Sequence, residues 1–200
     1  MSPVVKTNSD AAHRKEEKVL SAAEGCFVRY GFRKTTMGDI ALAAQISRPA
    51  LYLVYSSKED VFRAVVARLF ATMLTELGEG IDVRGEPIEQ LQFAFEVWCV
   101  RPFEIVQNAP DAADLLENSR QLSADAWNKA EADFETIVTD ILSRVMQGQG
   151  GPGLSAAQVA HVLATAVPGF KESARSVADL RGRIKDLLDL VLDGLQARAG

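Results

Sequence analysis

Residues 35–62 read TTMGDIALAAQISRPALYLVYSSKEDVF, and this stretch decides the fold of the N-terminal part of the chain. Thr36 is placed to cap a short helix over residues 37–44, because Thr and Ser accept hydrogen bonds from the first free N–H groups of a helix. Ser47 is placed in the same way before a second short helix, over residues 48–55. The stretch therefore predicts two short helices joined by a tight turn.

Longer helices are predicted on both sides of this pair. From Lys15 to Tyr30 apolar residues recur at spacings of three and four, and Gly31 then ends the helix. Ser57 is a third capping residue, and the helix that it opens begins at Lys58. Two short helices supported by longer neighbours form the helix-turn-helix plan, whose second helix lies in the major groove of DNA.

Four motifs in this region resemble a known family. They read FVRYGF from Phe27, TTMGDIA from Thr35, SRPALY from Ser47 and YSSKEDVF from Tyr55. Together they resemble the DNA-binding domain of TetR-type transcriptional regulators, over residues 13–73. Two departures stand out: Gln45 occupies a turn position where the family usually has Gly, and Leu53-Val54 replaces the usual His, Tyr or Trp.

The resemblance implies a homodimer that binds a palindromic DNA operator and is released by a small-molecule ligand. Repression is the expected outcome, although nothing in the sequence fixes repression over activation. Arg48 is expected to read a guanine edge, and Thr36, Tyr52 and Lys58 to contact phosphates. The residues expected to contact DNA are Thr36, Met37, Ser47, Arg48, Pro49, Ala50, Tyr52, Leu53 and Lys58.

The rest of the chain continues in helical spacing as far as Leu195, and no run of alternating apolar residues predicts a strand. The fold class is therefore all-α. A flexible arm is expected over residues 1–12, the DNA-binding domain over 13–73 with its helix-turn-helix at about 36–55, and a larger helical ligand-binding and dimerisation domain over 74–200. Breaks between helices are expected at residues 78–87, 101–102, 108–111 and 148–153.

Two sets of apolar residues in the larger domain carry functional expectations. An apolar or aromatic effector is expected to bind among aromatic side chains, although such a stripe is also what a packed core contains; these residues are Phe95, Trp98, Phe103, Trp127 and Phe134. The last two helices are expected to form a four-helix interface with a second copy, unless they fold back on their own domain. The interface residues are Phe170, Leu180, Ile184, Leu187, Leu188, Val191 and Leu195.

Composition and charge narrow the remaining classes. Of the 200 residues 48% are hydrophobic and 24% are charged, as in ordinary globular proteins. The net charge is −5, yet residues 1–60 hold nine Lys or Arg against seven acids, whereas residues 61–200 hold 13 against 20. A mildly basic head on an acidic body permits phosphate contact, although chance variation in surface charge also produces a split of this size.

The sequence lacks the signatures of catalysis, of metal binding and of membrane insertion. Cys26 and Cys99 lack a His at metal-ligand spacing, and the glycine-rich run at 148–153 lacks the Lys-Ser/Thr ending of a phosphate-binding loop. No apolar run is long enough to span a membrane, and residues 1–14 do not resemble a signal peptide. We expect a cytoplasmic protein that is not an enzyme and needs no metal or cofactor.

A second class of function competes with the regulator. A helical dimer whose DNA-binding head is degenerate would serve another protein partner. Gln45, Gly38, Leu53 and the acidic net charge favour this alternative slightly. Thr36, Arg48, Tyr52 and Lys58 oppose it, because they stand where contacts to phosphate and bases are expected.

Overall fold

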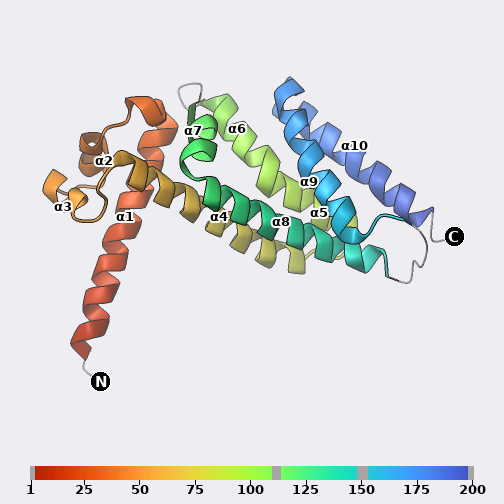
Figure 1. Cartoon of the computed structure of the whole chain (residues 1–200), viewed down its shortest axis with the longest axis horizontal. Helices are drawn as coiled ribbons and strands as arrows, with labels where there is room; N and C mark the ends of the chain where they lie inside the picture. Colours follow the sequence, from red (N-terminus) through yellow and green to blue (C-terminus); the bar gives the residue numbers. More distant parts are fainter. Residues whose placement is uncertain (1–2, 110–113, 148–152, 198–200) are drawn as a thin grey trace. The chain divides into compact units, whose positions relative to one another are not determined.

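The computed structural model describes residues 3–109, 114–147 and 153–197, and every regular element in these ranges is helical (Figure 1). This confirms the all-α fold class. The elements are α1 Pro3–Lys34, α2 Met37–Ala43, α3 Arg48–Tyr52, α4 Lys58–Asp82, α5 Pro87–Phe95, the π-helix η1 Glu96–Val100, α6 Arg101–Asn108, α7 Asp114–Leu122, α8 Ala124–Val145, α9 Ala156–Ser173 and α10 Val177–Gln196.

The chain divides into two compact units. Unit 1 comprises Met1–Leu69 and Val106–Ala126, and unit 2 comprises Phe70–Ile105 and Trp127–Gly200. The first division, after Leu69, lies four residues before the expected boundary at residues 73 and 74, and a distant segment also joins the N-terminal unit. That segment contains α7, which packs against α1.

The first helix differs from its prediction at one end and agrees with it at the other. The assigned helix begins at Pro3, so residues 3–12 are helical where an arm was expected. Near its C-terminal end, Gly31 has φ 76° and ψ 168°, and the backbone kinks there. An L-residue rarely adopts such a φ, so glycine is the residue that lets the helix stop and the chain turn.

Aromatic side chains form the centre of unit 1. The ring centroids of Phe27 and Phe62 lie 5.0 Å apart in an edge-on arrangement, and those of Phe32 and Phe62 lie 4.7 Å apart. Ile40 from α2 and Leu51 from α3 are fully buried. The two short helices therefore gain their stability from packing on α1 and α4, since isolated helices of this length are marginal in water.

The expected break at residues 78–87 is shorter than predicted. Helix α4 continues through Gly78 and Gly80 to Asp82, and α5 begins at Pro87. Gly80 has a packing role, because a Cβ atom built there would lie 2.2 Å from the ring of Phe93. A glycine inside a helix costs about 1 kcal/mol relative to alanine, and here it admits an aromatic ring.

The interruption expected at Arg101-Pro102 takes the form of a π-helical turn. η1 occupies the residues just before Arg101, and α6 follows without a loop. Proline lacks an N–H group and crowds the preceding turn, which an α-helix accommodates by widening locally. The expected turns at 108–111 and 148–153 lie largely outside the described residues.

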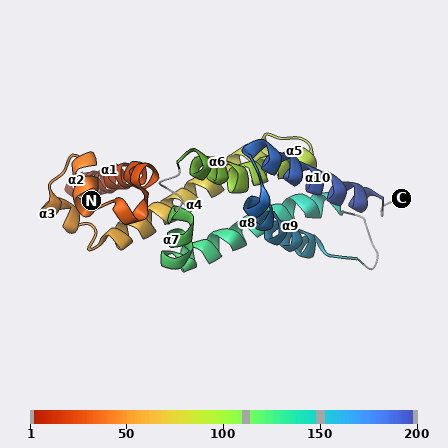
Figure 2. The ribbon, with the colours of Figure 1, turned by 90° about the horizontal axis from the view of Figure 1, so that it is seen from above.

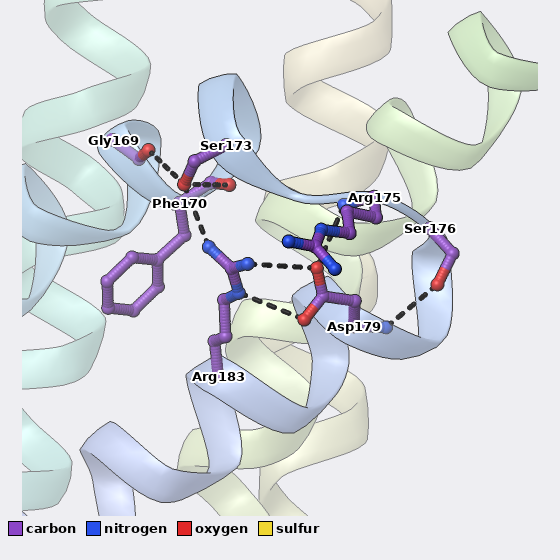
Figure 3. Close-up of polar contacts among 7 residues, drawn as sticks. All are labelled: Gly169, Phe170, Ser173, Arg175, Ser176, Asp179 and Arg183. Atoms are coloured by element: carbon purple, nitrogen blue, oxygen red, sulfur yellow. Dashed lines mark hydrogen bonds and ion pairs between the residues drawn. The ribbon is translucent and has the colours of Figure 1, made fainter.

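Helices α5, η1, α9 and α10 pack together in unit 2 (Figures 1 and 2). The corner between α9 and α10 is held by polar contacts that Figure 3 shows in close-up. Arg183 donates from Nε and Nη2 to the two carboxylate oxygens of Asp179, each at 3.0 Å, and from Nη1 to Ser173 Oγ at 2.8 Å. Asp179 also accepts from the Arg175 N–H, and these donors lower its pKa.

No helix in the described part of the chain is both long enough and apolar enough to cross a membrane.

Candidate nucleic-acid interface

The first helix of the pair is fixed by a reciprocal capping box. Thr36 Oγ1 accepts from the Asp39 N–H at 3.2 Å, while Asp39 Oδ2 accepts from the Thr36 N–H at 2.9 Å and from the Thr36 hydroxyl at 2.7 Å. These bonds lower the pKa of Asp39. The Thr36 hydroxyl therefore already has an anionic acceptor, with which a DNA phosphate would compete.

The turn between α2 and α3 has a left-handed backbone conformation at Gln45, the position where the TetR family usually has glycine. Gln45 has φ 54°, the only positive φ outside glycine among the described residues. Its N–H donates to Leu42 O at 3.0 Å, and the next N–H, of Ile46, donates to Ala41 O at 3.0 Å. A residue other than glycine in this conformation is strained, so the family's usual glycine would fit the observed geometry better.

The second helix, α3, presents its outer face to solvent. Ser47 caps it by accepting from the Ala50 N–H at 3.2 Å. Tyr52 and Leu53 are 54% and 85% exposed. Ser47, Arg48 and Pro49 are also exposed, and Ala50 is half-buried.

Arg48 folds back over α2. A Cβ atom built on Gly38 would lie 2.3 Å from Arg48 Nη2 and 2.9 Å from its Cζ, so the guanidinium rests where Gly38 has no side chain. The group also lies close enough to Asp39 to lower the pKa of that carboxyl further. Reading a base edge would require the Arg48 side chain to swing outward from this position.

Two residues expected to contact DNA are placed differently. Met37 is 8% exposed and belongs to the core of unit 1, because it faces inward from the first turn of α2. Lys58 donates from Nζ to Phe32 O at 2.8 Å, and its ammonium lies 4.3 Å from the centroid of the Phe32 ring. The Lys58 ammonium is thus already bound at the C-terminal end of α1, a contact that sequence spacing alone could not reveal.

The segment just before the helix-turn-helix is held from a second direction. Asp114, the first residue of α7, accepts from the Phe32 N–H and the Arg33 N–H, each at 3.0 Å. Thr35 Oγ1 donates to Gly31 O at 2.7 Å in the same segment. Sequence analysis missed Asp114, because 82 residues separate it from Phe32 and no local pattern links them.

Polar pairs also tie α1 to α4 and to the segment just before α4 within unit 1. Tyr55 Oη donates to Glu16 at 3.0 Å, and burial together with the nearby carboxylate raises the pKa of Tyr55. Arg68 binds Glu17 at 3.2 Å and Glu24 at 2.5 Å. These contacts fix the two long helices that support α2 and α3.

The aromatic residues expected to line an effector pocket pack on one another. The rings of Trp98 and Phe134 stack with centroids 4.7 Å apart, and Phe95 meets Phe134 edge-on at 5.3 Å. Trp127 packs edge-on against Phe70 at 4.8 Å, and Phe103 is 8% exposed. They form a packed core here, which is the alternative that the sequence left open.

The expected dimer stripe is mostly used inside the chain. Leu180, Ile184, Leu188 and Leu195 are at most 6% exposed, because α10 packs through them onto its own unit. Phe170, Leu187 and Val191 are half-buried. Four of the seven residues are therefore unavailable to a second copy, since the densest apolar stripe of a helix is the one its own core needs.

Comparison with known proteins places this geometry in a family. Residues 19–65, from the middle of α1 to the start of α4, match the profile of the family described as bacterial regulatory proteins, tetR family. Over these residues the chain carries a TetR-family DNA-binding domain. It is 36% identical over 142 residues to an uncharacterized helix-turn-helix-type transcriptional regulator, YfiR, from Bacillus subtilis, covering 70% of this chain and 57% of that protein.

Solved structures of transcriptional regulators share the fold. A TetR transcription regulator from Haloarcula marismortui superposes with a TM-score of 0.72 at 17% identity, covering 89% of this chain and 98% of that one. The regulator FadR from Bacillus subtilis, solved in complex with stearoyl-CoA, superposes with a TM-score of 0.61 at 17% identity, covering 86% and 96%.

The chain spans 57% of the length of YfiR and 52% of the length of a second curated relative, HbdR from Aromatoleum. These relatives are named as transcriptional regulators, in agreement with the expectation that the chain is not an enzyme.

Proposed function

We propose that this TetR-family chain is a DNA-binding transcriptional repressor that binds a palindromic operator as a homodimer. The observation that carries the proposal is the α2–α3 pair, a capped helix-turn-helix whose second helix turns its N-terminal residues to solvent. Both short helices rest on a packed aromatic core, so the backbone of the recognition helix is held in place and only the Arg48 side chain has to move.

Arg48 carries the sequence reading in this proposal. Its guanidinium lies on Gly38 and is not fixed by a bidentate carboxylate, so moving it to a guanine breaks no strong ion pair. A bidentate contact to guanine discriminates against the wrong base by about 1–3 kcal/mol. Tyr52 and Ser47 would contact phosphates, while Pro49, Ala50 and Leu53 would contact thymine methyl groups or sugars.

The homodimer in this proposal forms through apolar residues of α9 and α10 that are not buried in the core of their own unit. On α9, Val162 is 50% exposed and Phe170 is half-buried; on α10, Leu190 is 71% exposed and Leu187 and Val191 are half-buried. A two-fold dimer matches a palindromic operator, because each copy then meets an identical half-site.

Release by a small molecule completes the proposed mechanism. The structurally similar FadR was solved with stearoyl-CoA, a long apolar acyl chain joined to the polyanionic coenzyme A, and we extend the combination of apolar body and anionic group to the effector of this chain. An effector that binds one conformation of unit 2 better than another would shift the population away from the DNA-binding state. Operator occupancy without effector, and release with it, is repression.

Salt-dependent binding to a pool of random 30-base-pair duplexes, followed by fluorescence anisotropy, tests whether the head contacts DNA. A dimer that contacts about six to ten phosphates should lose about 10³–10⁵ in affinity between 50 and 200 mM salt. Arg48→Glu should weaken binding strongly. Lys129→Glu makes the same charge change on the exposed surface of α8 and should leave binding nearly unchanged.

The competing function gives a different result. A helical dimer with a degenerate head would have no duplex affinity to lose at any salt concentration. Equal effects of Arg48→Glu and Lys129→Glu would also contradict the proposal, because they would mark the binding as non-specific attraction to net charge.

A further inference from the structure

A groove in unit 2 lies between α5–η1 and α10, and it has a volume of about 690 Å³. One wall carries Glu89, Gln92, Phe93, Glu96 and Val100, which share one face because they recur at helical spacings. The other wall carries Ala178, Arg181, Gly182, Ile184 and Lys185 of α10, and Arg84 lies at the α4–α5 turn. This volume is in the range of small-molecule sites.

The groove is open because α10 has no side chain at Gly182, in its second turn. A Cβ atom built on Gly182 would meet nothing within 4 Å, so the space above this glycine is empty of protein. The apolar surface around it comes from Phe93, Val100 and Ile184. A flat apolar body can therefore lie against α10 without displacing a side chain.

The cationic side chains around the groove differ in whether a carboxylate pairs with them. Arg181 forms a two-bond pair with Glu96, at 2.8 and 2.7 Å, and Lys185 pairs with Asp189 on its own helix. Arg84 lies over the Phe93 ring, with Cζ 3.5 Å from the centroid, and donates to the Gly80 carbonyl. Among the described residues no carboxylate pairs with Arg84, so its charge is balanced only by a ring face and a carbonyl.

We propose that this groove binds an apolar monoanion, an aromatic or aliphatic body bearing one carboxylate or sulfonate. The anionic group pairs with Arg84, and the body covers Phe93, Val100 and the open surface at Gly182. Arginine suits this role, because its planar fork can hold a carboxylate while its face stays stacked on an aromatic ring. The site is separate from the aromatic core around Trp98 and does not depend on DNA binding.

The test uses the full chain and the fluorescent probe 8-anilinonaphthalene-1-sulfonate, an aromatic monoanion. We expect saturable binding that Gly182→Trp weakens at least about tenfold, because the indole fills the groove; such a change corresponds to 1.4 kcal/mol. The matched control is Gly78→Trp, an exposed glycine of α4 that also has nothing within 4 Å of a built Cβ. It should bind the probe as the wild type does.

The charge assignment has its own comparison. Arg84→Gln should weaken binding of the sulfonate probe about tenfold, and Arg84→Lys should restore only part of the affinity, since lysine keeps the charge but lacks the planar fork. Neither change should alter binding of the neutral analogue N-phenyl-1-naphthylamine. Thermal unfolding by circular dichroism confirms that each variant is folded.

Three results would overturn the proposal. The first is a wild type that shows no saturable probe binding, and the second is a Gly182→Trp variant that binds as tightly as the wild type. The third is dissociation of a dimer by Gly182→Trp in sedimentation, which would show that a second copy of the chain covers the groove.

Discussion

At the scale of single residues, Gln45 connects the sequence to the geometry of the turn most directly. Its φ of 54° is the conformation that the family's usual glycine adopts without strain. The left-handed conformation costs an L-residue about 1–2 kcal/mol, and the turn retains it because both flanking helices are packed. The Gln45 side chain offsets little of this cost, since its hydrogen bond from Lys18 Nζ is 3.5 Å long and exposed.

Gln45→Gly should therefore stabilise the protein. Relief of the backbone strain exceeds the entropy that glycine loses on folding, so the free energy of unfolding in urea should rise by up to about 1 kcal/mol. Gln45→Ala keeps the strained backbone, and it serves as the control that should show no gain. A lower stability for Gln45→Gly would mean that the turn relies on the Gln45 side chain.

At the scale of elements, the sequence predicted the helices whose signals are local and missed the contacts between distant ones. The caps Thr36 and Ser47 act within four residues, so both short helices could be located from their neighbours alone. Gly78 and Gly80 led to a predicted helix break where α4 in fact continues. The packing partner that explains Gly80 is Phe93, which lies on the next helix. Burial of the apolar stripe of α10 within its own unit likewise depends on which helices pack against it, and no local pattern shows that.

Asp114 is the clearest contact of this long-range kind, and it predicts a measurable loss. It binds the N–H groups of Phe32 and Arg33 at the end of α1, next to the recognition helices. Asp114→Ala leaves these donors without an acceptor, which should lower the free energy of unfolding by about 1–3 kcal/mol. Asp114→Asn keeps one carbonyl acceptor and should lose less. Equal stability of Asp114→Ala and wild type would contradict the contact.

The start of α4 predicts a pH dependence. Asp60 accepts from the hydroxyls of Ser56 and Ser57 and from Arg63, and these bonds lower its pKa from 3.8 to about 2. A carboxyl with a lowered folded pKa stabilises the fold fully above its unfolded pKa and loses that contribution as the pH falls towards its folded pKa. Asp60 should thus stabilise the protein above about pH 4 and cease to do so near pH 2.

Chemical unfolding at pH values from 2 to 6 measures this effect. The wild type should lose stability more steeply below pH 4 than Asp60→Asn, which cannot titrate there. Asp39 and Asp179 also have lowered pKa values and should leave Asp60→Asn with a smaller slope of the same sign. Identical slopes for the two proteins would remove the assigned role of Asp60.

At the scale of the whole molecule, the class of protein could be predicted from the sequence. Which apolar residues form a core and which line a binding site could not. The motifs around Thr36 and Arg48 indicated a TetR-type head, and the family match over residues 19–65 confirms that resemblance. Composition could not distinguish a packed aromatic core from a pocket, because both need the same residues at the same spacing. The groove between α5–η1 and α10 was missed for a related reason: its opening depends on the missing side chain of Gly182.

The central claim is that the chain reads DNA as a two-fold dimer, and selection from a random duplex pool at about 0.15 M salt tests it most directly. A two-fold dimer should enrich an inverted repeat whose half-sites lie about 10 base pairs apart, the spacing of successive major grooves. Arg48→Ala should relax the selected sequence at one base in each half-site. No enrichment from protein shown to be folded and dimeric would contradict the claim.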